Sequence, residues 1–181
     1  MIYSRCITIV VNFFIVIMQK RIAALTQKES NLKNQYENKV LCILKKGKID
    51  EETRNEMTIM IAEQFGIEEQ LYSLNHYSDK RRRKDFVNDL GEFEFTNDEI
   101  EEMLKTSEDD FLLKKYKVSA QPRSIQKAFE YNNKKFIKIL KQFIDKRNVF
   151  RKCENDSLLE ELVLLKCNLI KHLSIMSKLL K

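Results

Sequence analysis

Glycine, proline and tryptophan are almost missing from this chain of 181 residues, which contains three glycines, one proline and no tryptophan. Tight turns depend on glycine and proline, because these residues supply the backbone angles that such turns need. The composition therefore disfavours strand-rich folds and predicts an all-α protein. Glycine occurs only at positions 47, 66 and 91. The sequence thus contains neither a P-loop nor another glycine-rich turn that could hold a nucleotide.

Catalytic and metal-binding motifs are equally sparse. The two histidines, His76 and His172, have no sequence neighbour that indicates an activated nucleophile. The four cysteines are scattered without a C-x-x-C pair, which argues against a disulfide framework and against a zinc finger. We therefore predict a protein that is not an enzyme and that uses neither a metal nor a cofactor.

Charge is distributed in blocks of alternating sign. The formal net charge is +6 and the sequence pI is about 9.0, values that are compatible with binding to phosphate polyanions but do not prove it. Residues 91–110 contain nine acidic residues against one lysine, whereas residues 114–152 contain thirteen basic residues against two acidic ones. An acidic block of this kind cannot lie on DNA, so nucleic-acid binding is expected only on the basic regions.

The first seventeen residues contain the apolar run CITIVVNFFIVI, which is shorter than the roughly 20 residues that cross a bilayer. Three interpretations are open: a short anchor, a buried strand or helix, and an upstream extension that is not translated, with Met18 as the start. We favour the last two.

The remaining chain divides into a helical domain at 18–90, an acidic linker with a short helix at 91–113, and a basic, leucine-rich helical region at 114–181. A first helix is predicted over 19–45, with these apolar residues on its inner face: Ile22, Leu25, Leu32, Tyr36, Val40, Ile43 and Leu44. Gly47 should end it, and Asp50 should cap a second helix that ends at Gly66. A third helix is predicted from about 68 to 84.

Further helices are predicted in the two C-terminal regions. Thr96 and Glu99 form a capping box for a short helix. Ser124 is the expected cap of a long helix after Pro122. The last helix is so rich in leucine that it must pack centrally or against a partner.

Residues 61–84, IAEQFGIEEQLYSLNHYSDKRRRK, have the features of a helix-turn-helix. Ala62 is a small residue where two helices would pack, Gly66 would form the turn, and Leu71 and Leu74 would hold the second helix. The stretch resembles the homeodomain family, closely over about twenty-four residues and loosely over about sixty. It departs from that family in its shorter turn, in its lack of tryptophan, and in acidic residues such as Glu68 where phosphates would approach.

The resemblance implies a tri-helical, homeobox-like DNA-binding unit. Asn75 and His76 would then reach base edges, and a cationic cluster would contact phosphates: Lys80, Arg81, Arg82, Arg83 and Lys84. The alternative is a tri-helical protein-interaction module with an exposed basic tail.

A second basic surface is predicted on the long helix after Pro122. Its lysines lie beside Phe136 and Phe143 and form either a phosphate-binding stripe or the solvated side of an amphipathic helix: Lys134, Lys135, Lys138 and Lys141.

These features together predict a non-catalytic DNA-binding accessory subunit of a nuclear complex. In its composition, which is rich in Asn, Lys and Ile and poor in glycine, the chain is similar to the homeobox-like accessory subunits of ciliate DNA adenine methyltransferase complexes. That resemblance implies double-stranded DNA and other protein subunits as partners, the latter held by the leucine-rich last helix, and no membrane. The alternative is a helical scaffold subunit of an organellar or membrane-associated assembly, in which residues 1–17 are an anchor.

Overall fold

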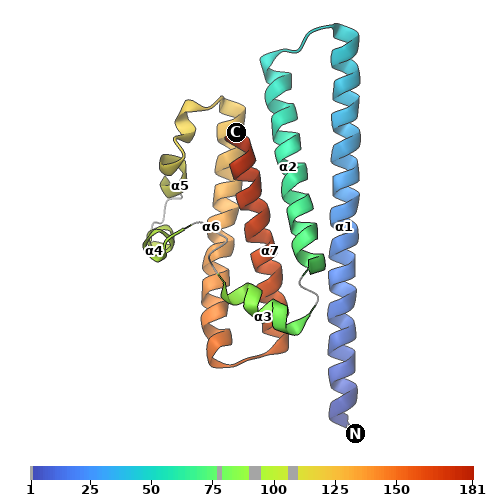
Figure 1. Cartoon of the computed structure of the whole chain (residues 1–181), viewed down its shortest axis with the longest axis vertical. Coiled ribbons are helices and arrows are strands. Elements are labelled where there is room, and N and C mark those ends of the chain that lie inside the picture. Colours follow the sequence, from blue (N-terminus) through green and yellow to red (C-terminus); the bar gives the residue numbers. More distant parts are fainter. Residues whose placement is uncertain (1, 77–78, 90–94, 106–109) are drawn as a thin grey trace.

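The computed structural model describes residues 2–76, 79–89, 95–105 and 110–181, and within these ranges the chain is helical with no strand. The predicted all-α class is therefore confirmed. The elements in chain order (Figure 1) are α1 (Ile2–Lys46), α2 (Glu51–His76), α3 (Lys80–Asn88), α4 (Asn97–Lys105), α5 (Asp110–Lys115), the short 3-10 helix η2 (Val118–Ala120), α6 (Arg123–Lys152) and α7 (Asp156–Leu179).

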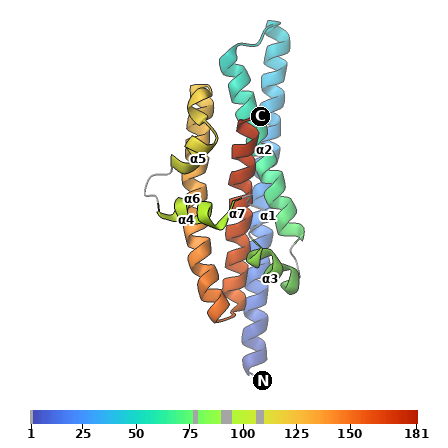
Figure 2. The same cartoon turned by 60° about the vertical axis from the view of Figure 1, so that its left-hand side comes forward.

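The four long helices lie side by side in the order α6, α7, α2, α1 (Figures 1 and 2). α7 packs against α6 on one side and α2 on the other, while α1 packs against α2. The short helix α3 lies against α7, and α4 and α5 lie beside α6. Buried side chains of α7 such as Leu162, Val163 and Leu169 belong to a core that also includes Phe129 and Phe136 of α6 and Ile67 of α2. The leucine-rich last helix is thus the centre of the fold.

Several helix ends lie where the sequence predicts them. Gly47 has a φ of 71°, a left-handed conformation that glycine adopts without strain, and it ends α1. Asp50 Oδ1 accepts a hydrogen bond of 2.7 Å from the backbone N–H of Thr53 at the start of α2. Thr96 and Glu99 form the predicted capping box, because the Glu99 N–H donates to Thr96 Oγ1 and the Thr96 N–H donates to Glu99 Oε2.

The predicted turn at Gly66 is wrong, because α2 continues without a break from Glu51 to His76. Gly66 is instead the place where α7 approaches α2 most tightly. A Cβ atom built on Gly66 would lie 2.5 Å from Cγ1 of Ile175 and 2.9 Å from the carbonyl oxygen of Lys171, both on α7. Ala62, one turn earlier, is also buried. The small residues of this stretch therefore form a helix-packing site rather than a helix-turn-helix.

Other predicted boundaries also change. The helix expected over 68–84 does not exist as one element, because its first part belongs to α2 and its basic end forms α3. Ser124 does not cap α6, which begins at Arg123 directly after Pro122. Proline is well suited to a helix start for two reasons. Its fixed φ is compatible with the helix, and the N–H group that it lacks would have no hydrogen-bond partner within the helix there.

The apolar N-terminal segment from Ile2 onward is helical and forms the first part of α1. In the described part of the chain, no helix combines the length and the hydropathy required to cross a membrane.

A polar contact point joins the first, second and last helices. The side-chain oxygen Oδ1 of Asn168 on α7 accepts a hydrogen bond of 2.5 Å from Arg21 Nη2 of α1 and one of 2.7 Å from Gln70 Nε2 of α2. Gln70 is fully buried, and this bond satisfies its amide nitrogen, whereas its Oε1 has no hydrogen-bond partner among the described residues. The contact fixes how α1 and α2 sit against α7.

Candidate interaction surfaces

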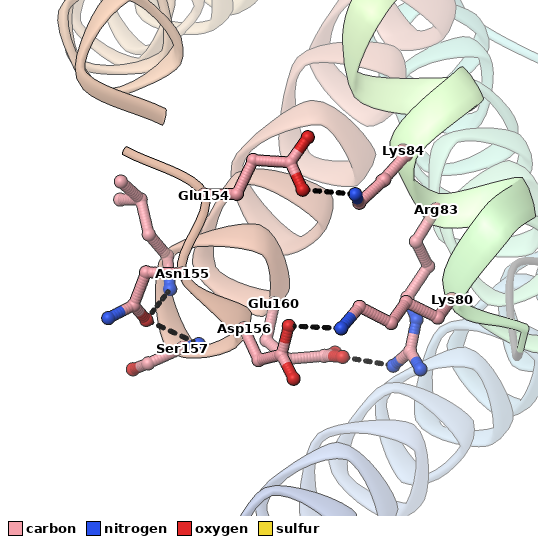
Figure 3. Close-up of polar contacts among 9 residues, drawn as sticks. Lys80, Arg83, Lys84, Glu154, Asn155, Asp156, Ser157 and Glu160 are labelled. Atoms are coloured by element: carbon pink, nitrogen blue, oxygen red, sulfur yellow. Dashed lines mark hydrogen bonds and ion pairs between the residues drawn. The ribbon is translucent and has the colours of Figure 1, made fainter. Parts of the chain in front are cut away.

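The cationic end of the predicted recognition helix lies on the protein's own acidic residues (Figure 3). Lys80 Nζ of α3 lies 2.6 Å from Asp156 Oδ1 at the first residue of α7. Arg83 pairs with Glu160 of α7, and Lys84 pairs with Glu154 in the turn between α6 and α7.

The pair between Arg83 and Glu160 is the least exposed of the three, with 22% and 12% of the two side chains accessible. Exposed ion pairs contribute little, whereas a partly buried pair is costly to break. This pair therefore fixes α3 onto α7.

Both ends of α3 are anchored. At its start, Asp79 Oδ1 accepts hydrogen bonds from the backbone N–H groups of Arg81 and Arg82, and these bonds lower the pKa of the Asp79 carboxyl. At its end, the fully buried Lys166 of α7 donates from Nζ to the carbonyl oxygens of Phe86 and Asp89. A lysine at a helix C-terminus also meets the negative end of the helix dipole. The helix is thus a fixed part of the bundle.

The other residues predicted to read DNA are separated from this cluster. Asn75 and His76 are exposed at the C-terminal end of α2, and the His76 ring stacks on Tyr72 at a centroid distance of 5.4 Å. They belong to a different helix from Arg81 and Arg82, which are exposed on α3. A single recognition helix carrying both sets of residues is therefore not formed.

The lysines of the second predicted surface have a different environment. Lys134, Lys135 and Lys138 are exposed on the outer face of α6, and Lys141 is half-buried there. None of the four forms an ion pair with a carboxylate of the described residues. Within the described ranges, the structure therefore pairs three of the five cations of the α3 cluster with carboxylates but leaves these four lysines of α6 without an ion pair.

A third surface was not predicted from the sequence. The ends of α1 and α2 that meet at Gly47 extend beyond the C-terminal end of α7 (Figures 1 and 2). Leu41 is 54% exposed and Leu44 is 72% exposed on this projection, and Ile49 is also exposed. We call residues 41–49 the hairpin tip. Leu44 was expected on the inner face of the first helix, but α7 does not reach this far, so nothing there covers the side chain.

The histidine that lies within the core has a structural role. His172 Nδ1 lies 2.8 Å from Asn132 Oδ1, and Asn132 Nδ2 donates to the carbonyl oxygen of Ala128. An amide oxygen only accepts, so the histidine ring donates from Nδ1. Burial lowers the pKa of His172 to about 4, which keeps the ring neutral. The described residues include no group of three or more histidine, cysteine, aspartate or glutamate side chains placed to hold a metal ion.

The described residues define a helical bundle protein with a cationic cluster on α3, a row of lysines on α6 and exposed apolar side chains at the hairpin tip. The chain belongs to the Pkip-1 protein family, whose model matches residues 21–180. The match covers all helices from α2 to α7 and the second half of α1. It therefore includes the α3 cluster, the lysines of α6 and the hairpin tip. No curated protein and no solved structure matches the chain.

The family match overturns the resemblance to homeobox-like proteins and to ciliate methyltransferase accessory subunits. The structural reason is that Gly66 and Ala62 are spaced for close packing of α7, and this spacing imitates a helix-turn-helix in the sequence. The pairing of Arg83 with Glu160, 77 residues apart, left no local signal in the sequence. Leu41 did leave a signal, since it falls outside the predicted inner face of the first helix, whereas Leu44 was predicted to lie on that face.

Proposed function

We propose that this protein is a non-catalytic accessory subunit that acts by binding another protein, and that the hairpin tip is the part that enters the partner. The observation that carries the proposal is the exposure of Leu41 and Leu44 on a projection that α6 and α7 do not cover. Isolated exposed apolar side chains are common, but clustered ones on a projecting helix are typical of interaction sites.

The hairpin is already formed in the free chain, because α1 packs along α2. Lys39 of α1 pairs with Glu56 of α2 just below the tip, and Lys28 Nζ lies 2.9 Å from Glu63 Oε1 further down. A preformed element loses less conformational freedom on binding than a disordered one. The tip can therefore insert without a costly rearrangement.

The charge around the tip indicates the kind of partner. Lys45, Lys46 and Lys48 are exposed beside the two leucines, and the exposed carboxylates of Asp50, Glu51 and Glu52 follow at the start of α2. We infer a partner protein with an apolar groove whose rim carries acidic groups opposite the end of α1 and basic groups opposite the start of α2, because opposite charges at the rim steer association and exclude wrong partners.

The free energy available at the tip follows from its exposed area. Complete burial of a leucine side chain contributes about 1.5–3 kcal/mol. With the exposed fractions of 54% and 72%, Leu41 and Leu44 together contribute about 2–4 kcal/mol on full burial. Replacing both by glutamine should weaken binding by roughly thirtyfold or more.

The test is quantitative affinity capture from the source cells with the full-length protein. The double variant Leu41→Gln/Leu44→Gln is compared with wild type and with Ile61→Gln/Val149→Gln, which changes two exposed aliphatic residues on α2 and α6. We expect a protein partner that wild type and the control retain and that the tip variant loses. Circular dichroism should show equal folding of all three.

Two results would contradict the proposal. One is equal retention of the same partner by the tip variant and wild type. The other is binding of the tip to anionic vesicles, with loss in the same variant and no protein partner, which would favour the membrane-associated alternative.

A further inference from the structure

The outer face of α6 carries a row of lysines and differs chemically from the hairpin tip. We call its five lysines the lysine stripe: Lys127, Lys134, Lys135, Lys138 and Lys141. Four of them recur at intervals of seven, four and three residues, which places them along one side of the helix. The opposite side of α6 packs into the core through Phe129, Phe136 and Phe143.

From Lys134 to Lys141 the stripe is a strip of positive charge, and Glu130 separates this part from Lys127. Between Glu130 and Asp145, α6 contains four lysines and no carboxylate. At about 1.5 Å per residue, the stripe from Lys127 to Lys141 is roughly 21 Å long and, on a single helix, nearly straight. In the described part of the chain, no carboxylate pairs with any of these lysines, although Lys146 on the same helix pairs with Glu161 of α7 at 2.8 Å.

This arrangement is unfavourable for the isolated protein. Lys134 and Lys138 are four residues apart, and Lys138 and Lys141 are three apart, so like charges face one another. Such pairs destabilise a helix by repulsion, whereas opposite charges at the same spacing stabilise it. An anionic ligand that lies along the helix would relieve the repulsion.

An aromatic side chain lies within the stripe. Tyr131 is 61% exposed, and Lys135 Nζ lies 5.6 Å from the centre of its ring. An exposed aromatic ring next to cations is the arrangement on which an unpaired base stacks while the cations contact the backbone. An acidic protein surface would use the lysines but has no need of the ring.

We propose that the lysine stripe of α6 binds the phosphate backbone of a nucleic acid, with Tyr131 as a stacking site for an unpaired base. A 10 Å length of duplex carries about six phosphates, which is enough to engage the four lysines between Lys134 and Lys141. The binding is independent of sequence, because backbone contacts carry no base information. The proposal rests on α6 alone and not on the hairpin tip.

The experiment measures fluorescence anisotropy of labelled 20-nucleotide single strands and 20-base-pair duplexes with the full chain at 50 and 200 mM KCl. Four engaged phosphates give a slope of log affinity against log salt of about −3 for the single strand and about −4 for the duplex. The stripe variant changes four lysines to glutamine: Lys134, Lys135, Lys138 and Lys141. It should bind at least tenfold more weakly with a flatter slope, and Tyr131→Ala should weaken single-strand binding only.

A control with the same loss of charge replaces four scattered, exposed lysines by glutamine: Lys20, Lys33, Lys105 and Lys181. It should bind within threefold of wild type. The proposal is overturned if the control loses as much affinity as the stripe variant, since binding would then reflect net charge alone. It is also overturned if the stripe binds polyglutamate and neither nucleic acid, which would make its ligand an acidic protein.

Discussion

Gly66 offers the sharpest test of how α2 and α7 pack. In an ordinary helix interior, Gly→Ala stabilises by about 0.5–1 kcal/mol, because alanine loses less conformational freedom. At Gly66 the new methyl carbon would lie 2.5 Å from Ile175 Cγ1 and 2.9 Å from the backbone oxygen of Lys171. Overpacking of a core contact costs about 1–3 kcal/mol, and a backbone contact cannot be relieved by a rotamer change.

We therefore expect Gly66→Ala to destabilise the protein by about 1–2 kcal/mol after the helix-propensity gain is subtracted. For a chain of this size, that corresponds to a fall in Tm of roughly 3–6 °C. Urea unfolding and thermal unfolding, both followed by circular dichroism at 222 nm, measure the change.

A matched control comes from the same helix. Glu68 is exposed, so Glu68→Ala should be more stable than Glu68→Gly by the propensity difference alone. The double variant Gly66→Ala/Ile175→Ala should lose less free energy of unfolding than the two single variants together, by at least about 0.5 kcal/mol. The reason is that the contact between the new methyl group and the Ile175 side chain disappears. If Gly66→Ala instead stabilises the protein as alanine does at position 68, α7 does not approach Gly66 and the packing described here is wrong.

Three further predictions concern polar groups of the core. Lys166→Met should cost roughly 2–4 kcal/mol in urea unfolding, because the carbonyl oxygens at the end of α3 lose their buried donor. Burial lowers the pKa of His172 from 6.5 to about 4, so the unfolded chain takes up the proton first on acidification, and stability present at pH 7 falls between these two values. That loss should reach about 3 kcal/mol relative to the same titration of His172→Gln. Arg83→Ala and Glu160→Ala should each destabilise by about 1–3 kcal/mol and show coupling in a double-mutant cycle, whereas Arg81→Ala should change stability by less than about 0.5 kcal/mol.

Each of these has a clear contrary outcome. Equal stability of Lys166→Met and wild type would show that α3 is not held by that lysine. Parallel pH profiles for wild type and His172→Gln would show that the ring is not buried neutral. A larger loss of stability for Arg81→Ala than for Arg83→Ala would show that Arg83 is not the cation that holds α3 against α7.

Much of the helical architecture could be predicted from the sequence because its causes are local. Gly47 ends α1 through its left-handed φ, and Asp50 caps α2 through a bond to a residue three positions away. The Thr96 and Glu99 pair begins α4 in the same way. Each of these signals spans only a few residues, so no knowledge of the tertiary fold is needed to read it.

The predicted helix-turn-helix is wrong because the decisive contacts are remote. Small residues at the spacing of Ala62 and Gly66 are compatible both with a turn and with a closely packed neighbouring helix, and the sequence does not distinguish the two. The basic cluster of α3 looks free until α7 places Glu160 and Asp156 beside it. An ion pair between residues far apart in the chain leaves no periodic pattern.

By itself, the amino-acid sequence determined the helical class, most of the caps and the amphipathic pattern of α6, since these follow from backbone preferences and from the spacing of apolar residues. Only the tertiary structure decided which small residues are packing contacts, which cations are neutralised and which leucines remain in water. Those outcomes depend on where α7 lies and where it ends. Gly66 is an interhelical contact because α7 covers it. Leu44 is exposed because α7 stops short of it.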